Sequence, residues 1–142
     1  MKVSVLKIIS KSNIYKDDFK TAYEKYSEIF ALNVREDEIV SNLSVGEKQK
    51  IEIMKLIFNN SNIMLLDEPT AGMARADTNN TIDLLAEIQD KRKITKVIIE
   101  HDMHVVFSLA QRISVLAQGH VIVEDKPAKI KGHPKVKEAY LG

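Results

Sequence analysis

The sequence has 142 residues, of which 44% are hydrophobic, and this length and composition fit one ordinary domain with a buried core. The chain has 21 Lys and Arg residues and 20 Asp and Glu residues. This near balance excludes a large net positive charge that would attract the protein to nucleic acid. The absence of cysteine excludes disulfides, thiolate nucleophiles and cysteine-ligated zinc. No apolar stretch approaches the roughly 18–20 residues that a membrane span requires.

Helix candidates and a charged turn occupy the first part of the chain. Residues 17–32 place apolar side chains at helical spacing between Lys and Glu, which predicts an amphipathic helix. Residues 2–9 are a second, shorter helix candidate. The charged run at 35–38 is typical of a solvated turn and needs no chemical role.

From residue 43 onward, short strand and helix candidates alternate, which is typical of an α/β layered domain. Ser44 and Glu47 match a capping box, so we expect a helix that begins there and ends at the break at 59–60. Residues 62–66 form a compact apolar run, which predicts a buried strand with polar groups at its C-terminal end.

The strand and helix pattern then repeats. A helix is predicted over about 78–91, followed by an apolar strand over 96–100 that also ends in charged residues. Two parallel strands are therefore expected to present charged groups at one edge of a sheet.

The C-terminal region is predicted to contain a β-hairpin and short helices. Residues 103–111 suggest a short helix, and the runs at 113–117 and 121–124 flank a predicted hairpin turn at 118–120. Pro127 and Pro134 stand where short terminal helices can begin.

The helix start at Ser44 is a candidate phosphate site. A helix N-terminus gathers unpaired backbone N–H groups and a partial positive charge, and Gly46 would let the backbone approach a phosphate closely. The alternative is an ordinary capping box, which the same residues explain without any ligand.

Adjacent carboxylates end the strand predicted at 62–66. Asp67 and Glu68 are costly to place at the end of a buried strand unless they bind a cation, and Mg²⁺ with a phosphate-bearing nucleotide is the usual solution. Asp67 would hold the metal through water, and Glu68 would orient or deprotonate the attacking water. The alternative is a solvated strand end.

A histidine, His101, follows the strand predicted at 96–100, at the corresponding edge of the sheet. A neutral imidazole at His101 can donate a hydrogen bond to a γ-phosphate and sense its loss. His101 and His104 also suggest a metal pair, but no third ligand accompanies them and we do not expect zinc. The simplest interpretation of His104, His120 and His133 is that they are surface residues.

The order and spacing of these elements are distinctive in combination. LSVGE at 43–47, LLDEP at 65–69 and IIEHD at 98–102 resemble the signature motif, the Walker B motif with its catalytic glutamate, and the H-loop of ABC ATPases. The signature here has Val45 and Glu47 where the commonest form has Gly and Gln. The resemblance covers the chain from about residue 15 to its C-terminus.

The resemblance implies an α/β fold, specifically a partial P-loop NTPase fold of the ABC ATPase type. This fold has parallel strands with flanking helices, an N-terminal helical-subdomain segment and a C-terminal β-hairpin. Residues 1–42 would belong to the helical subdomain that contacts the membrane permease, and residues 43–142 would form the C-terminal part of the ATPase core.

The resemblance also implies roles for individual residues. The signature residues would contact the γ-phosphate of ATP held by a second ATP-binding subunit, and they are Ser44, Val45, Gly46 and Glu47. Asp67 (through Mg²⁺), Glu68 and His101 would serve the ATP of their own subunit. Ala71, Gly72 and Met73 fall where the D-loop lies. The assembled protein would lie in the cytoplasm, at the inner face of the cell membrane.

The solute class rests on shorter stretches. AGM at 71–73, IIEHDMHVV from 98 and VKEAYLG at the C-terminus resemble ATP-binding subunits of branched-chain amino acid or urea importers. The segment LSVGEKQKIEIMK also resembles sugar and nucleoside importers. ATP-binding subunits do not touch the solute, so this assignment is a hypothesis.

The chain lacks the Walker A motif. A P-loop requires G-x-x-x-x-G-K-[ST], and none of the glycines, which are Gly46, Gly72, Gly119, Gly132 and Gly142, has that motif around it. The Q-loop glutamine is absent too. We therefore expect no ATPase activity from this chain alone, and unpaired sheet edges that favour self-association or docking of a complementary fragment.

Three origins fit such a chain: an expressed fragment, a truncated gene product or one half of a split subunit. Two other functions are alternatives to an importer subunit. The first is a non-catalytic interaction module that contributes its signature helix to the ATP site of a partner. The second is a fragment of a DNA-repair or chromosome-structuring ATPase, against which the balanced charge and the short helical insert argue.

Overall fold

The computed structural model describes residues 23–24, 27–28, 34–35, 37–59 and 61–141. The chain divides into two compact units, Met1–Ile99 and Glu100–Gly142, called here the first and the second unit, although its length permitted a single domain. The helix expected over 2–9 lies outside the described residues. Most of the helix expected over 17–32 does so too, and its described residues 23, 24, 27 and 28 are helical. The boundary between 42 and 43 stays a prediction.

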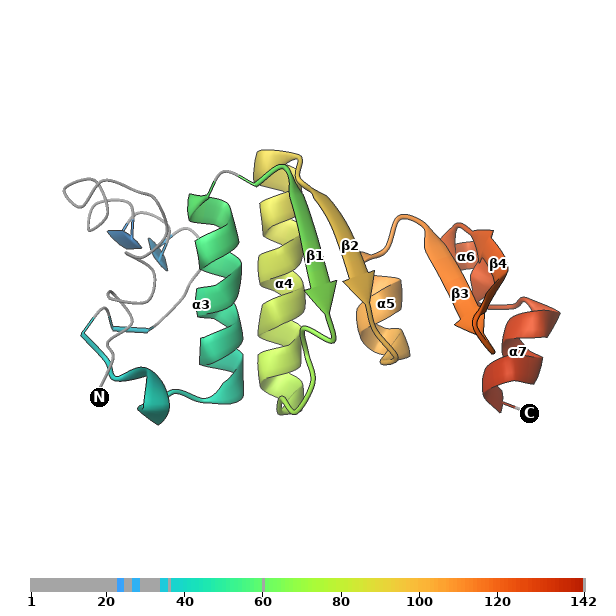
Figure 1. The fold of residues 1–142 in the computed structure, drawn as a ribbon, viewed down its shortest axis with the longest axis horizontal. Coiled ribbons are helices and arrows are strands. Elements are labelled where there is room, and N and C mark those ends of the chain that lie inside the picture. Colours follow the sequence, from blue (N-terminus) through green and yellow to red (C-terminus); the bar gives the residue numbers. More distant parts are fainter. Residues whose placement is uncertain (1–22, 25–26, 29–33, 36, 60, 142) are drawn as a thin grey trace. The chain divides into compact units, whose positions relative to one another are not determined.

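The first unit contains two parallel strands that are connected by a helix (Figure 1). A 3-10 turn and another helix precede them in the chain. Their order is η1 (Val40–Asn42), α3 (Val45–Phe58), β1 (Ile63–Asp67), α4 (Arg75–Arg92) and β2 (Thr95–Ile99). Strands β1 and β2 pair in parallel, from Ile63 opposite Thr95 to Asp67 opposite Ile99. The predicted α/β class, with both strands and both helices, is confirmed.

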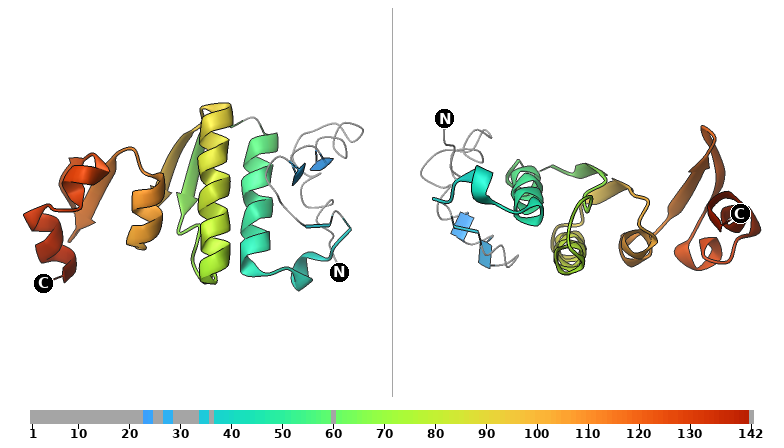
Figure 2. Two further views of the ribbon diagram at one scale, coloured as in Figure 1. Left: turned by 180° about the vertical axis from the view of Figure 1, so that it is seen from behind. Right: turned by 90° about the horizontal axis from the view of Figure 1, so that it is seen from below.

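Helix α4 lies on one face of the β1–β2 pair, with α3 beside it (Figure 2). Met64 and Leu66 of β1 are buried, as are Ile53 of α3 and Leu85 and Ile88 of α4. Burial of such side chains stabilises the fold by about 1.5–3 kcal/mol each before the cost of ordering them. The core of the first unit is therefore built from α3, α4 and one side of β1.

Two long side chains connect these elements through main-chain carbonyls. Arg92 at the end of α4 donates from Nη1 to the Ile57 carbonyl of α3 at 2.9 Å. Lys96 of β2 donates from Nζ to the Leu85 carbonyl of α4, and burial lowers the pKa of this ammonium group. Lys96 is the register partner of Met64, so both belong to the face that α4 covers.

The opposite face of the β1–β2 pair is exposed, which contradicts the expectation of a buried strand. Ile63 and Leu65 are 64% and 71% exposed, and Val97 and Ile99 of β2 are 47% and 56% exposed. Alternate residues of a strand point to opposite faces, so α4 covers only one set. Among the described residues nothing forms a second layer over the other set.

The second unit is a hairpin with short helices packed on it. It contains α5 (Met103–Leu109), β3 (Ile113–Ala117), β4 (His120–Asp125), α6 (Pro127–Ile130) and α7 (Pro134–Leu141). Strands β3 and β4 pair antiparallel, and Ile113, Val115 and Ile130 form a small core. The predicted hairpin and both proline-initiated helices are confirmed.

The hairpin turn is tighter than expected. Gln118 and Gly119 have φ angles of 50° and 79°, the left-handed pair that suits a two-residue hairpin turn. His120 was expected in the turn but is the first residue of β4, paired with Ala117. The right-handed twist of the strands favours a two-residue turn over a longer one, which explains why His120 lies in the strand.

One buried and one exposed leucine of the first unit give a matched pair of substitutions. Leu85→Ala removes a fully buried side chain, and we expect it to lower the free energy of unfolding by about 2–5 kcal/mol. Leu65→Ala removes an exposed side chain and should change it by less than about 0.5 kcal/mol. Urea denaturation followed by circular dichroism measures both, and equal effects would contradict the assigned core.

Candidate functional site

The first candidate element is the N-terminus of α3. Ser44 is the N-cap, and its Oγ accepts a hydrogen bond from the Glu47 N–H at 3.2 Å. Glu47 Oε2 accepts from the Ser44 N–H at 2.8 Å, which completes the capping box. The predicted capping box is therefore confirmed, and it stabilises the helix by about 1 kcal/mol.

Because of the capping box, fewer backbone N–H donors remain for a phosphate at this helix end than the sequence suggested. In the described part of the chain, the Val45 and Gly46 N–H groups are the first-turn donors that no hydrogen bond engages. The hydrogen bond from the Ser44 N–H lowers the pKa of Glu47, so its negative charge offsets the partial positive charge of the helix end. The Val45 side chain is 50% exposed at this end.

Gly46 has a packing role that sequence reasoning missed. A Cβ added at Gly46 would lie 3.1 Å from both Cβ and Cγ of Asp77, in the first turn of α4. A glycine therefore lets the starts of α3 and α4 approach each other. Asp77 is far from Gly46 in sequence, and no local pattern announces the contact.

The second candidate element is the end of β1. Asp67 and Glu68 are both exposed, so the cost of burying two carboxylates, on which the cation argument rested, does not arise. Asp67 is the register partner of Ile99 and lies on the same exposed face as Ile63 and Leu65. The assignment of Asp67 to Mg²⁺ stays a prediction.

Glu68 has an unusual backbone conformation. Its φ angle is 44°, in the left-handed region that non-glycine residues seldom adopt. The Glu68 N–H donates to the Ile99 carbonyl at 2.9 Å, and its carbonyl accepts from the Ala71 N–H at 3.0 Å. These bonds hold a backbone conformation that costs on the order of 1–3 kcal/mol.

The segment expected to be the D-loop forms a turn between β1 and α4. Gly72 has a φ angle of 71°, which favours glycine, and the Met73 N–H donates to the Thr70 carbonyl at 3.2 Å. Thr81 of α4 donates from Oγ1 to Met73 Sδ at 3.5 Å. The loop that contains Ala71, Gly72 and Met73 is thus attached to α4.

His101 belongs to the second unit, two positions after β2 ends. Glu100 Oε2 accepts from the His101 N–H at 3.2 Å, and Asp102 caps α5 by accepting from the His104 N–H at 2.8 Å. His101, His104 and His120 are exposed, whereas His133 is only partly exposed and its Nδ1 is buried. The expectation that His101 faces the Asp67 and Glu68 carboxylates stays a prediction.

The residues present fit part of a magnesium and nucleotide site. Mg²⁺ is usually bound by one or two carboxylates together with phosphate oxygens and water, and the exposed Asp67 and Glu68 suit that mode. Among the described residues no three His, Asp or Glu side chains gather in a metal-binding group. The phosphate-binding loop is not in the sequence.

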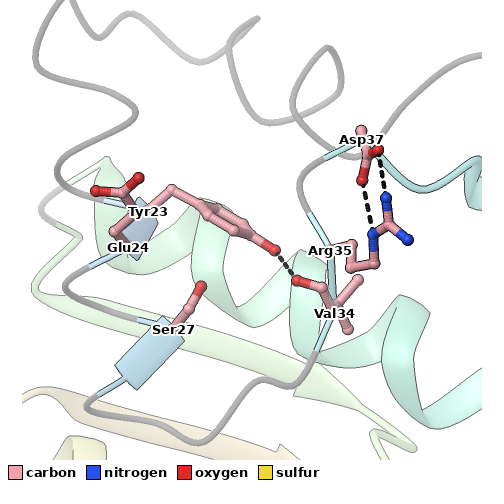
Figure 3. Close-up of a pocket in the computed structure, with 6 residues that line it drawn as sticks. All are labelled: Tyr23, Glu24, Ser27, Val34, Arg35 and Asp37. Carbon is pink, nitrogen blue, oxygen red and sulfur yellow. Dashed lines mark hydrogen bonds and ion pairs between the residues drawn. The ribbon is translucent and has the colours of Figure 1, made fainter.

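A pocket of about 300 Å³ lies elsewhere in the first unit, away from the motif residues. Figure 3 shows its lining, which is Tyr23, Glu24, Ser27, Val34, Arg35 and Asp37. Tyr23 donates to the Val34 carbonyl at 2.5 Å, and Arg35 Nη2 contacts Asp37 Oδ2 at 2.7 Å. The ion pair is exposed, as expected of the solvated turn predicted at 35–38.

Within the part of the chain that the structure describes, no helix is long and apolar enough to cross a membrane.

Comparison with known families matches two parts of the chain. The model of the ABC transporter family matches residues 3–71, and that of the branched-chain amino acid ATP-binding cassette transporter family matches residues 120–142.

Curated relatives are longer than this chain. The high-affinity branched-chain amino acid transport ATP-binding protein LivG of Escherichia coli (strain K12) is 36% identical over 102 residues, which are 72% of this chain and 40% of LivG. BraF of Pseudomonas aeruginosa, with the same description, is 34% identical over 70% of this chain and 39% of its own length. The methionine import ATP-binding protein MetN of Photorhabdus laumondii is 30% identical over 87% of this chain and 36% of its own. The chain thus spans about 40% of the curated relatives it matches.

Solved structures share the fold. An ATP-binding cassette of an ABC transporter in its ADP conformation has a TM-score of 0.81 at 24% identity, covering 99% of this chain and 63% of that one. An inward-facing putative metal-chelate type ABC transporter has a TM-score of 0.84 at 19% identity, covering 99% of this chain and 60% of that one. The match includes nearly all of this chain.

The strained Glu68 backbone can be tested by two substitutions at one position. Glu68→Gly relieves the left-handed strain, and we expect it to raise the free energy of unfolding by about 1 kcal/mol. Glu68→Ala removes the same carboxylate but keeps the strain, so it should not stabilise the protein. Denaturant unfolding of both variants measures this difference, and equal stabilities would count against the strain.

The capping box gives a pH prediction. Glu47→Gln keeps an acceptor for the Ser44 N–H but removes the charge, and should lower the free energy of unfolding by about 0.5 kcal/mol at pH 7. The pKa of Glu47 is lowered in the folded protein, so the charge contributes its full stability at pH values above the ordinary glutamate pKa of about 4.3. This contribution is lost as the pH falls through the pKa of Glu47 in the folded state. The difference between variant and parent should therefore shrink in acid.

Unfolding curves at several pH values measure this dependence. Glu138→Gln, a substitution of an exposed residue of α7, is the matched control and should change the free energy of unfolding by less than about 0.5 kcal/mol. A Glu47→Gln difference that persists unchanged in acid would show that the charge contributes nothing.

Proposed function

Because the chain belongs to the ABC transporter family of ATP-binding proteins, we propose that it supplies the signature helix and the catalytic strand ends of an importer's ATP-binding subunit. The observation that carries this proposal is the parallel pairing of β1 with β2. It sets Asp67, from LLDEP, opposite Ile99, from IIEHD, so that the two motif strands end side by side.

The proposed mechanism assigns each strand end a task. When bound, ATP would supply the phosphoryl group that is transferred to water, and Mg²⁺ would neutralise charge on its phosphates. Asp67 would hold the metal through water, and Glu68, at the start of the turn, would orient or deprotonate the attacking water. His101 would donate a hydrogen bond to the terminal phosphate.

The signature helix would act on a different nucleotide. In this proposal the N-terminus of α3 faces ATP held by a second ATP-binding subunit, and the exposed Val45 lies at that surface. The Val45 and Gly46 N–H groups are the donors left for a phosphate, because Ser44 and Glu47 satisfy each other. Ser44 Oγ would also contact the phosphate while it caps the helix.

For the solute we propose an amino acid, and a branched-chain amino acid in particular. LivG and BraF are described as branched-chain amino acid transport ATP-binding proteins. The family that matches residues 120–142 is described as a branched-chain amino acid ATP-binding cassette transporter. MetN, described as a methionine import protein, supports the broader class. Membrane permease subunits at the cytoplasmic face would be the other partners.

A chimera tests the proposed function. The chain's matching segment would replace the 102 matched residues of E. coli LivG, and ATP hydrolysis would be measured on the purified protein. We expect the chimera to hydrolyse ATP and Glu68→Gln to lower its kcat by about 100-fold or more. The isolated chain, without a phosphate loop, should neither hydrolyse ATP nor bind a fluorescent ATP analogue at submicromolar concentration.

Glu52→Gln is the matched control for Glu68→Gln, because Glu52 is an exposed residue of α3 that pairs with Lys55 at the surface. It should leave kcat unchanged. A folded chimera without activity, or one that tolerates Glu68→Gln as well as Glu52→Gln, would contradict the assigned mechanism. Hydrolysis by the isolated chain would contradict the inferred dependence on a phosphate loop.

The exposed N-terminus of α3, with Val45 50% exposed, supports a second candidate, a non-catalytic module that offers this helix end to a partner's ATP site. In that case Glu68→Gln would have no effect on the partner's activity, whereas disruption of the helix end at Ser44 would lower it.

A further inference from the structure

The N-termini of α3 and α4 lie side by side at one end of the first unit, because both helices run in the same direction (Figure 1). A Cβ added at Gly46 would lie 3.1 Å from Cβ and Cγ of Asp77 and 3.5 Å from its Oδ1. The carboxylate of Asp77, in the first turn of α4, therefore packs against the first turn of α3. Gly46 is buried, whereas Asp77 is partly exposed.

Asp77 places a negative charge beside two positively polarised helix ends. A helix N-terminus carries the equivalent of roughly half a positive charge, so two adjacent ends repel each other. Ala74 is the N-cap of α4 and its side chain makes no capping hydrogen bond, which leaves Asp77 as the acidic residue of that first turn. Among the described residues no side chain forms an ion pair with Asp77. Its carboxylate is thus placed to act as an internal counter-ion for both helix ends.

A phosphate bound at α3 would meet the field of this carboxylate. In the proposed function, the Val45 and Gly46 N–H groups donate to a phosphate of the nucleotide that the second subunit holds. Such a phosphate would lie within one Debye length of Asp77, about 10 Å at 0.1 M salt, so the two negative charges repel. Glu47 is also negative, but its carboxylate accepts from the Ser44 N–H in the capping box. The charge of Asp77, by contrast, can be removed without uncapping α3.

We propose that Asp77 is an internal counter-ion that weakens the binding of a nucleotide phosphate at the α3 N-terminus and so favours release of the nucleotide. This inference rests on the proposed function for the identity of the anion. The electrostatic part rests on the contact between Gly46 and Asp77 and on the adjoining helix ends. The alternative is a purely structural role, in which Asp77 only stabilises the start of α4.

Asp77→Asn tests the charge, because Asn has nearly the same shape and keeps the contact with Gly46. In the LivG chimera this variant should lower the KM for ATP by about 3–10-fold at low ionic strength, without raising kcat. Salt screens charge effects, so the difference should shrink to less than about 2-fold at about 1 M salt, where the Debye length is about 3 Å. A purely structural role would neither lower KM nor give this salt dependence.

Asp83→Asn is the matched control, since Asp83 is an exposed residue in the middle of the same helix. It removes the same charge about 9 Å further along the axis of α4, away from both N-termini. Its KM should stay within about 2-fold of the parent value. In an active chimera, an Asp77→Asn variant with an unchanged or raised KM, or one that Asp83→Asn matches, would overturn the inference.

A second measurement separates this inference from the proposed function. Inorganic tripolyphosphate is titrated into the full chain while NMR follows the amide signals of Val45 and Gly46. Asp77→Asn should lower the Kd by about 3–10-fold relative to both the parent chain and Asp83→Asn. If this difference appears while the chimera is inactive, the proposed function fails and the counter-ion role stands. Equal Kd values in the three chains, or amide signals that tripolyphosphate does not move, would contradict the counter-ion role.

Discussion

Register between β1 and β2 determines where the candidate residues of the first unit lie. Because Ile63 is opposite Thr95, the paired ends are Asp67 and Ile99, and a shift by one residue would turn the alternating side chains to the other face. Buried Met64 and Leu66 make such a shift costly, since both would leave the core under α4. The hydrophobic contact with α4 thus holds Asp67 on the exposed face of β1, opposite α4.

The same register explains the conformation of Glu68. Its N–H continues the hydrogen bonding of the strand by donating to the Ile99 carbonyl, while its carbonyl already closes the turn to Ala71. A residue that must end a ladder and begin a turn at once has few backbone conformations available, and here it adopts the left-handed one. The two backbone hydrogen bonds of Glu68 therefore account for its left-handed conformation.

Features that depend on neighbours in sequence were predictable. The capping box joins Ser44 to Glu47, the hairpin turn joins two adjacent strands, and Pro127 sets the start of a helix, so each follows from a few consecutive residues. The contact between Gly46 and Asp77 joins the starts of two helices and leaves no local pattern. The expectation of a buried strand was wrong for a related reason, since burial of the second face of β1 requires a layer that composition cannot reveal.

Electrostatics limits what this chain can do with a nucleotide. The residues proposed around the phosphates include Asp67, Glu68 and Glu47, and the lowered pKa of Glu47 keeps it charged. Carboxylates repel a triphosphate unless a metal ion lies between them, so in the proposed function Asp67 and Glu68 depend on Mg²⁺ at their own nucleotide. At the nucleotide of the other subunit, the Val45 and Gly46 N–H groups are the donors that offset the charge of Glu47.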